Sequence, residues 1–254
     1  CDERGPSDSD AVDADVFGEG VYMRCLQATR HTHKLRRGQH SANHFTIRLR
    51  PAEAACVLAE DRLNDWFPNY FGPQRVSAAN VAMARRWLAQ GVRKAQGKRR
   101  TRSRSGAGGR RGWHLSVLRS ELFNAVLAVR VAQGNYNVQL AGDVLDKGIP
   151  TGPLWGRGRS ATTGLAAAIE QEALAPYSEV CEALEFTGLQ QGRRALAQRP
   201  ANFSFAPVSS GSENEVELSF LLPPGAYATA LLAHHFTVHD DSRVRDDSSK
   251  YERV

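Results

Sequence analysis

The segment Pro68-Asn69-Tyr70-Phe71-Gly72-Pro73-Gln74-Arg75 separates two stretches of helical periodicity and decides how the chain is organised. Its two prolines and its glycine exclude a continuous helix, so it predicts a turn rich in aromatic side chains. Before it, residues 51–67 predict a helix, with a proline in the first turn and apolar residues on one side. After it, apolar residues at helical spacing predict a second helix from about residue 81 to about Gly91.

Strand and helix patterns follow one another irregularly along the rest of the chain. Residues 45–50 and 215–222 alternate apolar and polar side chains, the period of a half-buried strand. Residues 115–129 and 227–236 have the apolar spacing of amphipathic helices. Residues 142–164 are rich in glycine and proline and predict mostly loop, followed by a short helix that Thr162 or Thr163 can cap. This irregular order predicts an α+β protein.

The net charge of +6 is concentrated in one region. Between Trp66 and Ser120 there are thirteen Lys or Arg residues and no Asp or Glu, and the densest part is interrupted by Gly and Ser. Such a segment suits a polyanion, because each phosphate that it neutralises releases condensed counterions. The alternative is a solvated basic loop without function. The charge pattern therefore favours nucleic acid as the partner.

The cysteines Cys1, Cys25, Cys56 and Cys181 are far apart and form no C-x-x-C pair. This spacing is typical of free thiols in a reducing cytoplasm rather than of disulfides or zinc ligands. No apolar run approaches the roughly 20 residues that span a bilayer. We therefore expect a cytoplasmic protein that does not use a membrane.

Four sequence blocks carry a resemblance to a known family. The first is Arg30-His31-Thr32-His33-Lys34-Leu35 with Asn43-His44-Phe45, and the second is the segment 68–75. The third is residues 115–124 with the later segments 141–143 and 151–156, and the fourth is residues 222–229, preceded by Arg193-Arg194. Their order, from about Gly20 to Phe236, resembles the TruD family of tRNA pseudouridine synthases. The chain departs from the family pattern at Ala42, where glycine is usual, and at Val76-Ser77, where Phe-Gly is usual.

The resemblance implies a pseudouridine-synthase catalytic domain, built from a mixed or antiparallel sheet with helices, that is interrupted by a TRUD-type α/β insertion domain. We expect residues 1–63 and 191–254 to contribute to the catalytic domain and residues 64–190 to form the insertion. Family members convert a uridine in the D-arm region of tRNA, position 13, into pseudouridine without a metal or other cofactor. The expected protein is a monomer whose partner is tRNA.

The resemblance also implies a pocket for the target base. In the family the phenylalanine at the position of Phe45 packs against the base, and Asn43 is expected to hydrogen-bond the active-site backbone or carboxylate. An aromatic face stacked on a base contributes about 1–3 kcal/mol. The alternative is structural, because Phe45, Ile47 and Leu49 share one face of the predicted strand and would all point into a core.

A set of polar side chains is expected to contact RNA. These candidates are Asn69, Gln74, Arg75, Arg99, Arg100, Arg102, Arg104 and Arg119. For the residues of segment 68–75 the alternative is that the segment only shapes the hinge into the insertion.

No catalytic residue can be nominated within the sequence. The family's nucleophile is the aspartate of a Gly-x-Lys-Asp loop before the Arg-His block, but none of the five lysines here is followed by Asp. We expect that aspartate upstream of Cys1, in an N-terminal segment that the sequence lacks, and we expect the 254 residues alone to be inactive. Asp143 matches a Gly-Asp turn and is interpreted as capping a loop. The alternative to a synthase is a non-catalytic relative that binds tRNA or another RNA.

Overall fold

The computed structural model describes residues 40–49, 64–97, 107–208 and 215–236. The chain divides into two compact units, and every helix and strand described below belongs to the second, Ser41–Val254. No described helix is long and apolar enough to cross a membrane.

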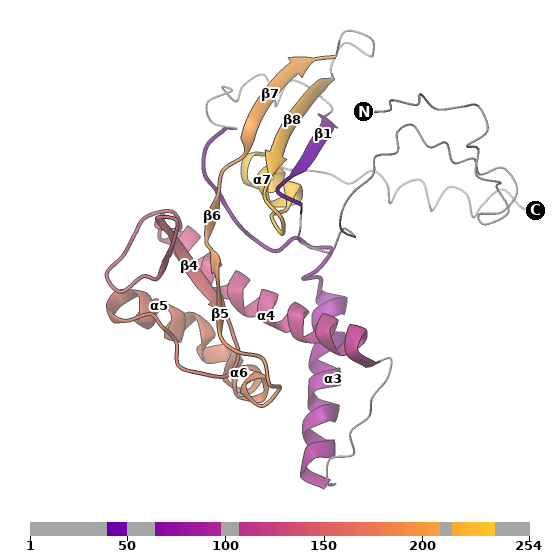
Figure 1. The fold of residues 1–254 in the computed structure, drawn as a ribbon, viewed down its shortest axis with the longest axis vertical. Helices are drawn as coiled ribbons and strands as arrows, with labels where there is room; N and C mark the ends of the chain where they lie inside the picture. Colours follow the sequence, from indigo (N-terminus) through magenta and orange to yellow (C-terminus); the bar gives the residue numbers. More distant parts are fainter. Residues whose placement is uncertain (1–39, 50–63, 98–106, 209–214, 237–254) are drawn as a thin grey trace, which may run out of the picture. The chain divides into compact units, whose positions relative to one another are not determined.

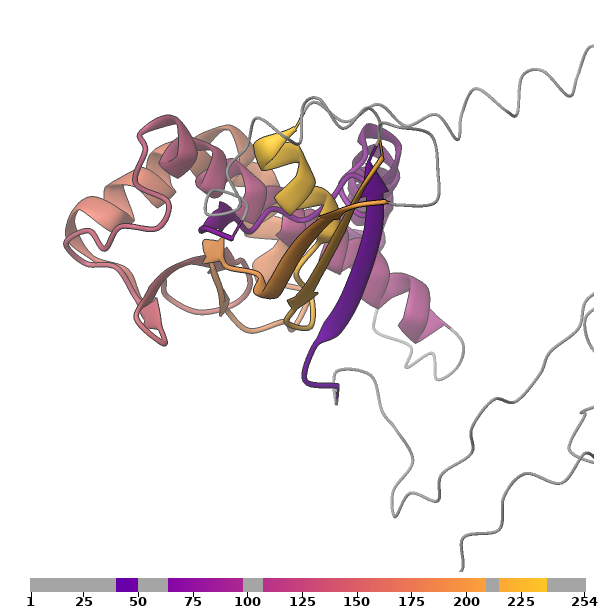
Figure 2. The same cartoon turned by 90° about the horizontal axis from the view of Figure 1, so that it is seen from above.

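A three-stranded antiparallel sheet joins segments from the two ends of the described chain. Its central strand β8 (Val216–Leu222) pairs with β1 (Asn43–Leu49) on one side and β7 (Ala201–Pro207) on the other (Figure 1). Alternate residues of β8 are buried, as its sequence pattern predicts. Helix α7 (Ala228–His235) covers one face of the sheet and shares a core with it (Figure 2). The predicted strands at 45–50 and 215–222 and the predicted helix at 227–236 are thereby confirmed.

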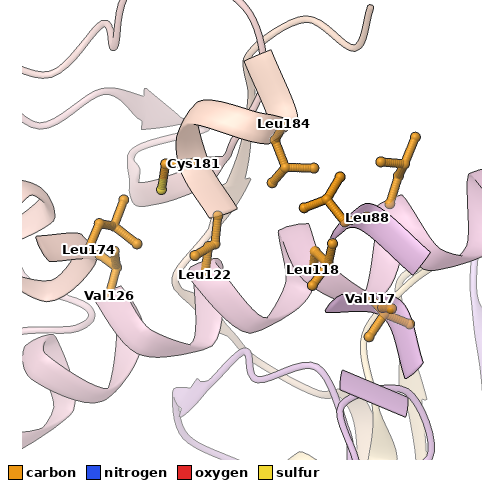
Figure 3. Packing of buried hydrophobic residues seen from close by; sticks show 10 residues of the cluster. Leu88, Val117, Leu118, Leu122, Val126, Leu174, Cys181 and Leu184 are labelled. Atoms are coloured by element: carbon orange, nitrogen blue, oxygen red, sulfur yellow. The ribbon is translucent and has the colours of Figure 1, made fainter. Parts of the chain in front are cut away.

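The remaining elements form a helical part around α4 (Ala107–Ala132). Three helices pack near it, α3 (Ala78–Gly97), α5 (Gly164–Leu174) and α6 (Ser178–Glu185), with the short 3₁₀ helix η2 (Ala175–Tyr177) between the last two. A small antiparallel sheet accompanies them, in the order β3 (Leu145–Asp146), β4 (Ile149–Leu154) and β5 (Gly192–Ala195). Figure 3 shows Leu118 and Leu122 of α4 pointing between the neighbouring helices, and both are fully buried. Burying a leucine side chain contributes about 1.5–3 kcal/mol, so this cluster stabilises the helical part.

Two very short strands connect the sheet of β8 to the helical part. β2 (Phe67–Pro68) and β6 (Ala197–Gln198) pair antiparallel, so the chain enters and leaves the helical part side by side. Phe67 is fully buried in the core that α7 shares with β8. Strand β5 pairs with β4 although it follows residue 190. The domain boundaries at 63 and 190 stay a prediction.

Several predicted boundaries were wrong. Residues 64–67 are not helical, because Phe67 pairs with Gln198 as a strand, and the rest of the predicted helix, 51–63, lies outside the described residues. Helix α3 continues through Gly91 to Gly97, since a glycine inside a helix costs only about 1 kcal/mol. Helix α4 begins at Ala107, within the stretch predicted as loop up to about Gly112. Residues 149–154 form a strand because partners on both sides pair with them.

The other predicted helices are present. Helix α4 contains residues 115–129, but it is buried on more than one side and is therefore not amphipathic as predicted. Helix α5 follows Thr163, which occupies the N-cap position in an extended conformation but makes no side-chain capping hydrogen bond.

Candidate nucleic-acid interface and base pocket

The candidate base pocket begins with a column of aromatic rings on one face of the sheet. Phe45 lies directly opposite Phe220 in the β1–β8 register, and the two rings stack with centroids 5.5 Å apart and 25° between their planes. Phe203 of β7 stacks on Phe220 as well, at 6.2 Å. Phe220 is fully buried whereas Phe45 is only partly buried. This placement agrees with the structural alternative, in which Phe45 points into a core. Because Phe45 is only partly buried, it also leaves room for contact with a base, and the role of Phe45 in base binding stays a prediction.

Asn43 lies on the same face of β1 as Phe45, two residues earlier, and is partly buried. It pairs with Leu222, the last residue of β8 before the turn at Pro223-Pro224-Gly225. Its side chain forms no hydrogen bond with another described residue. Asn43 is thus placed beside Phe45, and the partner of its amide stays a prediction.

Segment 68–75 forms the junction between the sheet and the helical part, beginning with Asn69. This side chain is only 2% exposed; Nδ2 donates to the Ala195 carbonyl at 2.8 Å, and Oδ1 accepts from Arg194. Arg194 also donates to the carbonyl of Gly225 at 3.0 Å, and its guanidinium lies 4.1 Å from the ring centre of Phe71. Burial lowers the pKa of Arg194 to about 10, so the side chain stays charged at neutral pH.

Phe71 is held by both its backbone and its ring. The side-chain amide of Asn124 on α4 accepts from the Phe71 N–H at 2.9 Å and donates to the Phe71 carbonyl at 3.0 Å. The ring meets Phe123 of α4 edge-on at 5.5 Å and Tyr227 at 6.0 Å. The turn is therefore tied to α4 on one side and to the loop before α7 on the other.

Arg75 makes the second link between these two elements. Its Nε donates to the hydroxyl of Tyr227 at 2.8 Å, and its Nη1 donates to Oγ of Ser116 on α4. Gly72 permits this close approach, because a Cβ there would stand 2.8 Å from Oγ1 of Thr229. Segment 68–75 thus lies directly against Tyr227 and Thr229, which are far away in the sequence.

The other candidate RNA-binding residues differ in their surroundings. The side chain of Gln74 is exposed. Arg119 donates to the carbonyls of Leu154 and Gln190 at 2.7 and 3.0 Å, and burial lowers its pKa. The four arginines at positions 99, 100, 102 and 104 lie outside the described residues. Asn69, Arg75 and Arg119 are accordingly engaged with protein atoms, while Gln74 faces solvent.

Sequence reasoning did not assign the partners of Asn124, Arg194 and Tyr227, although all three belong to the blocks that it singled out. For Arg194 the sequence does contain a signal, since this arginine directly precedes the apolar residues Ala195-Leu196-Ala197. An arginine that is buried in such a stretch needs hydrogen-bond or charge partners.

The interpretation of Asp143 is confirmed. Its carboxylate accepts from the Leu140 N–H and forms a buried ion pair with Arg130 at 3.0 Å, which holds the turn after α4.

Described residues line a smaller and a larger cavity that are open to the surface. The smaller, about 270 Å³, lies at the junction, and its lining includes the polar side chains of Asn69, Asp146, Arg193 and Arg194. The larger, about 510 Å³, lies between α5 and α6 and is mostly apolar, with Glu170, Glu182 and Glu185 among its lining residues. Because these three carboxylates are joined by no basic side chain, whereas two arginines outnumber Asp146 in the smaller cavity, the smaller cavity is the better candidate for contact with nucleic acid.

Within the described ranges no group of three His, Cys, Asp or Glu side chains could hold a metal ion. Cys181 is a free, buried thiol, as predicted, and burial together with the nearby Glu185 raises its pKa to about 11. The other three cysteines lie outside the described residues.

No protein-family model matches the chain. Among curated relatives, a tRNA pseudouridine synthase D of Cellvibrio japonicus is 38% identical over 215 residues, which are 83% of this chain and 60% of that protein. A protein of the same name from Xanthomonas oryzae pv. oryzae is 35% identical over 270 residues, covering 90% of this chain and 72% of the relative. The chain spans about 60–65% of the length of several of these relatives.

The fold has a counterpart of known structure, a Methanosarcina mazei protein assigned as a tRNA pseudouridine synthase D (TruD). The TM-score is 0.57 at 17% identity, over 80% of this chain and 70% of that one. The α+β architecture is therefore that of the TruD pseudouridine synthases. With identities of 34–38% over most of its length, the chain belongs to the tRNA pseudouridine synthase D family.

Proposed function

We propose that this protein isomerises a uridine of tRNA to pseudouridine, at position 13 in the D-arm region. The observation that carries the proposal is the match to relatives named tRNA pseudouridine synthase D, which covers 83–90% of the chain at 34–38% identity. It acts as a monomer on tRNA in the cytoplasm, without a metal or other cofactor.

The reaction breaks the bond between the ribose C1′ and N1 of uracil and forms a bond between C1′ and C5. The base must first leave its stack, which costs a few kcal/mol. Phe45 would offset this cost by stacking on the extruded base, and its own position is fixed by the ring of Phe220, on which Phe203 also stacks. Asn43, on the same face, would orient the backbone or the carboxylate that acts on the ribose or base. We assign that carboxylate to none of the described residues.

Residues 64–190 would form an insertion whose contacts with the catalytic domain fix a groove for RNA. Asn69 and Arg75 support this groove through their hydrogen bonds to Ala195, Arg194 and Tyr227, and Arg119 supports it by joining Leu154 to Gln190. Gln74 is exposed and can reach RNA directly. The arginines at 99, 100, 102 and 104 would bind phosphates.

The test is release of tritium from a tRNA transcript labelled with [5-³H]uridine, since isomerisation detaches the hydrogen on C5. The longest product of the gene is assayed beside the 254-residue chain. We expect release by the longest product, loss of release in its Phe45→Ala variant, and tRNA binding without release by the 254 residues. If the longest product binds tRNA but releases no tritium, the isomerase proposal is wrong.

The second candidate function is binding of tRNA without catalysis. It is favoured by one observation, that no lysine in the sequence is followed by aspartate. Tritium release by either protein rules it out.

A further inference from the structure

Trp113, near the start of α4, is an exposed indole on a rigid support. Its side chain is 38% exposed, and its ring meets His114 edge-on with centroids 5.2 Å apart. His114 in turn stacks on Trp87 of α3, at 5.3 Å and 19°. Trp87 packs against the buried cluster of α3, α4 and α6. The stacked rings of His114 and Trp87 thus connect Trp113 at the surface to this buried cluster.

The sequence around Trp113 is strongly basic. It lies within the segment 66–120, which has thirteen Lys or Arg residues and no acid. Arg86, beside Trp87, is exposed and forms no ion pair with a described carboxylate. The guanidinium of Arg111 is exposed and donates to the carbonyl of Thr187, which leaves its charge unbalanced by that contact. A partner of this surface should therefore be a polyanion.

Trp113 lies close to the junction formed by segment 68–75. Trp113 and Ser116 are three residues apart on α4, so their side chains are neighbours on the helix surface. Ser116 accepts from Arg75, which also donates to Tyr227. Trp113 is therefore one helical turn away from the link between α4 and the loop before α7.

We propose that Trp113 stacks on an unpaired base of the RNA substrate, while basic side chains of the segment 66–120 attract the phosphate backbone. The inference rests on the proposed function in that the RNA is tRNA, but it concerns binding and does not require catalysis. A base offers a flat face to an aromatic ring only when it is unstacked, so the site selects loops and single strands over duplex. Each base stacked on an aromatic ring contributes about 1–3 kcal/mol, with little dependence on sequence.

The experiment compares binding of a fluorescein-labelled single-stranded oligouridine of about 12 nucleotides with binding of a blunt RNA duplex of the same length. The proteins are the 254-residue chain and its variants Trp113→Ala, Trp113→Phe and Phe186→Ala. Phe186 is the matched control because it is an aromatic side chain, 82% exposed, that lies outside the basic segment 66–120.

We expect Trp113→Ala to weaken single-strand binding about 5-fold to 150-fold and to leave duplex binding nearly unchanged. Trp113→Phe, which keeps an aromatic face, should weaken binding less, and Phe186→Ala should bind like the parent chain. The single strand should also quench the tryptophan emission of the parent chain more than that of Trp113→Phe.

Three outcomes would overturn the inference: unchanged single-strand affinity in Trp113→Ala, equal weakening for single strand and duplex, or equal weakening in the alanine and phenylalanine variants. The inference and the proposed function fail in different ways. If the parent chain binds RNA through Trp113 but the longest gene product releases no tritium, only the isomerase proposal is wrong. If tritium is released but Trp113→Ala binds the single strand like the parent chain, only the role of Trp113 is wrong.

Discussion

Asn124 recognises the backbone of a turn with both ends of one side-chain amide. It accepts from the Phe71 N–H and donates to the Phe71 carbonyl, at 2.9 and 3.0 Å. A neighbouring strand would supply the same pair of hydrogen bonds in a sheet. Because backbone groups that leave water need partners, this one residue of α4 allows Phe71 to pack at the junction.

Replacing Asn124 with aspartate tests this role, because aspartate has nearly the same shape but cannot donate when ionised. The Phe71 carbonyl would lose its partner and face a carboxylate, so we expect the free energy of unfolding to fall by about 1–3 kcal/mol. Urea denaturation measures this change. The control is Asn137→Asp, an exposed position at which we expect a change within about 0.5 kcal/mol. Equal effects of the two variants would contradict the role of Asn124.

His235, at the end of α7, makes the stability of the fold depend on pH. Burial and, to a lesser extent, His234 lower its pKa to about 4, while Asp65 acts in the opposite direction. Its Nε2 is buried without a hydrogen-bond partner among the described residues. An unfolded histidine, with a pKa near 6.5, takes up a proton before the folded one does. Stability should therefore fall as the pH decreases from about 6.5 to about 4 and should not change through this group above pH 6.5 or so.

The variant His235→Gln removes this titration. Its free energy of unfolding should decline less than that of the parent chain between about pH 7 and pH 5, measured by urea denaturation at each pH. Parallel pH profiles for the two proteins would show that His235 does not control the acid response.

Helix α4 organises the helical part because more than one of its sides is buried. Leu118 and Leu122 face α3 and α6, whereas Phe123 and Leu127 pack with Leu196 in a separate cluster. Asn124 and Ser116 contact segment 68–75. A helix that is apolar on several sides belongs in the interior of a protein.

Leu122→Ala tests the central position of α4. Leu122 is fully buried, so the variant should lower the free energy of unfolding by about 2–5 kcal/mol through reduced burial and the cavity left behind. Chemical denaturation measures the decrease, and Leu165→Ala on the exposed side of α5 is the matched control. We expect the control to change stability by less than about 1 kcal/mol. A small effect at both positions would mean that α4 is not the core of this part.

The elements that the sequence predicts well are those whose pattern is local. The spacing of Leu115, Leu118, Leu122 and Val126 identifies α4, and the alternation in 216–222 identifies β8. The pairing of Phe67 with Gln198 has no local pattern, because two-residue strands depend on a partner from a distant segment. For the same reason the sequence marks Asn69 and Arg75 as candidates but does not show that their side chains bind protein atoms.

At the scale of the molecule, the charges are separated along the sequence. Residues 160–192 contain five glutamates and no Lys or Arg, while residues 66–120 contain thirteen Lys or Arg residues and no acid. Three carboxylates line the larger cavity, whereas two arginines and one carboxylate, Asp146, line the smaller one at the junction. A field of this kind orients an approaching polyanion before contact, so RNA should meet the basic segment first.

The salt dependence of tRNA affinity measures how much of this field acts through direct binding of phosphates. Replacing Arg99, Arg100, Arg102 and Arg104 with alanine should weaken binding and flatten the plot of log affinity against log salt, by about 1 in slope for each phosphate that is no longer neutralised. Arg48→Ala is the control, because Arg48 is exposed on β1 and already pairs with Glu217. Weaker affinity with an unchanged slope would mean that the four arginines act only at long range. Since Trp113→Ala should weaken single-strand binding with little change in slope, the two measurements together separate phosphate binding from base stacking.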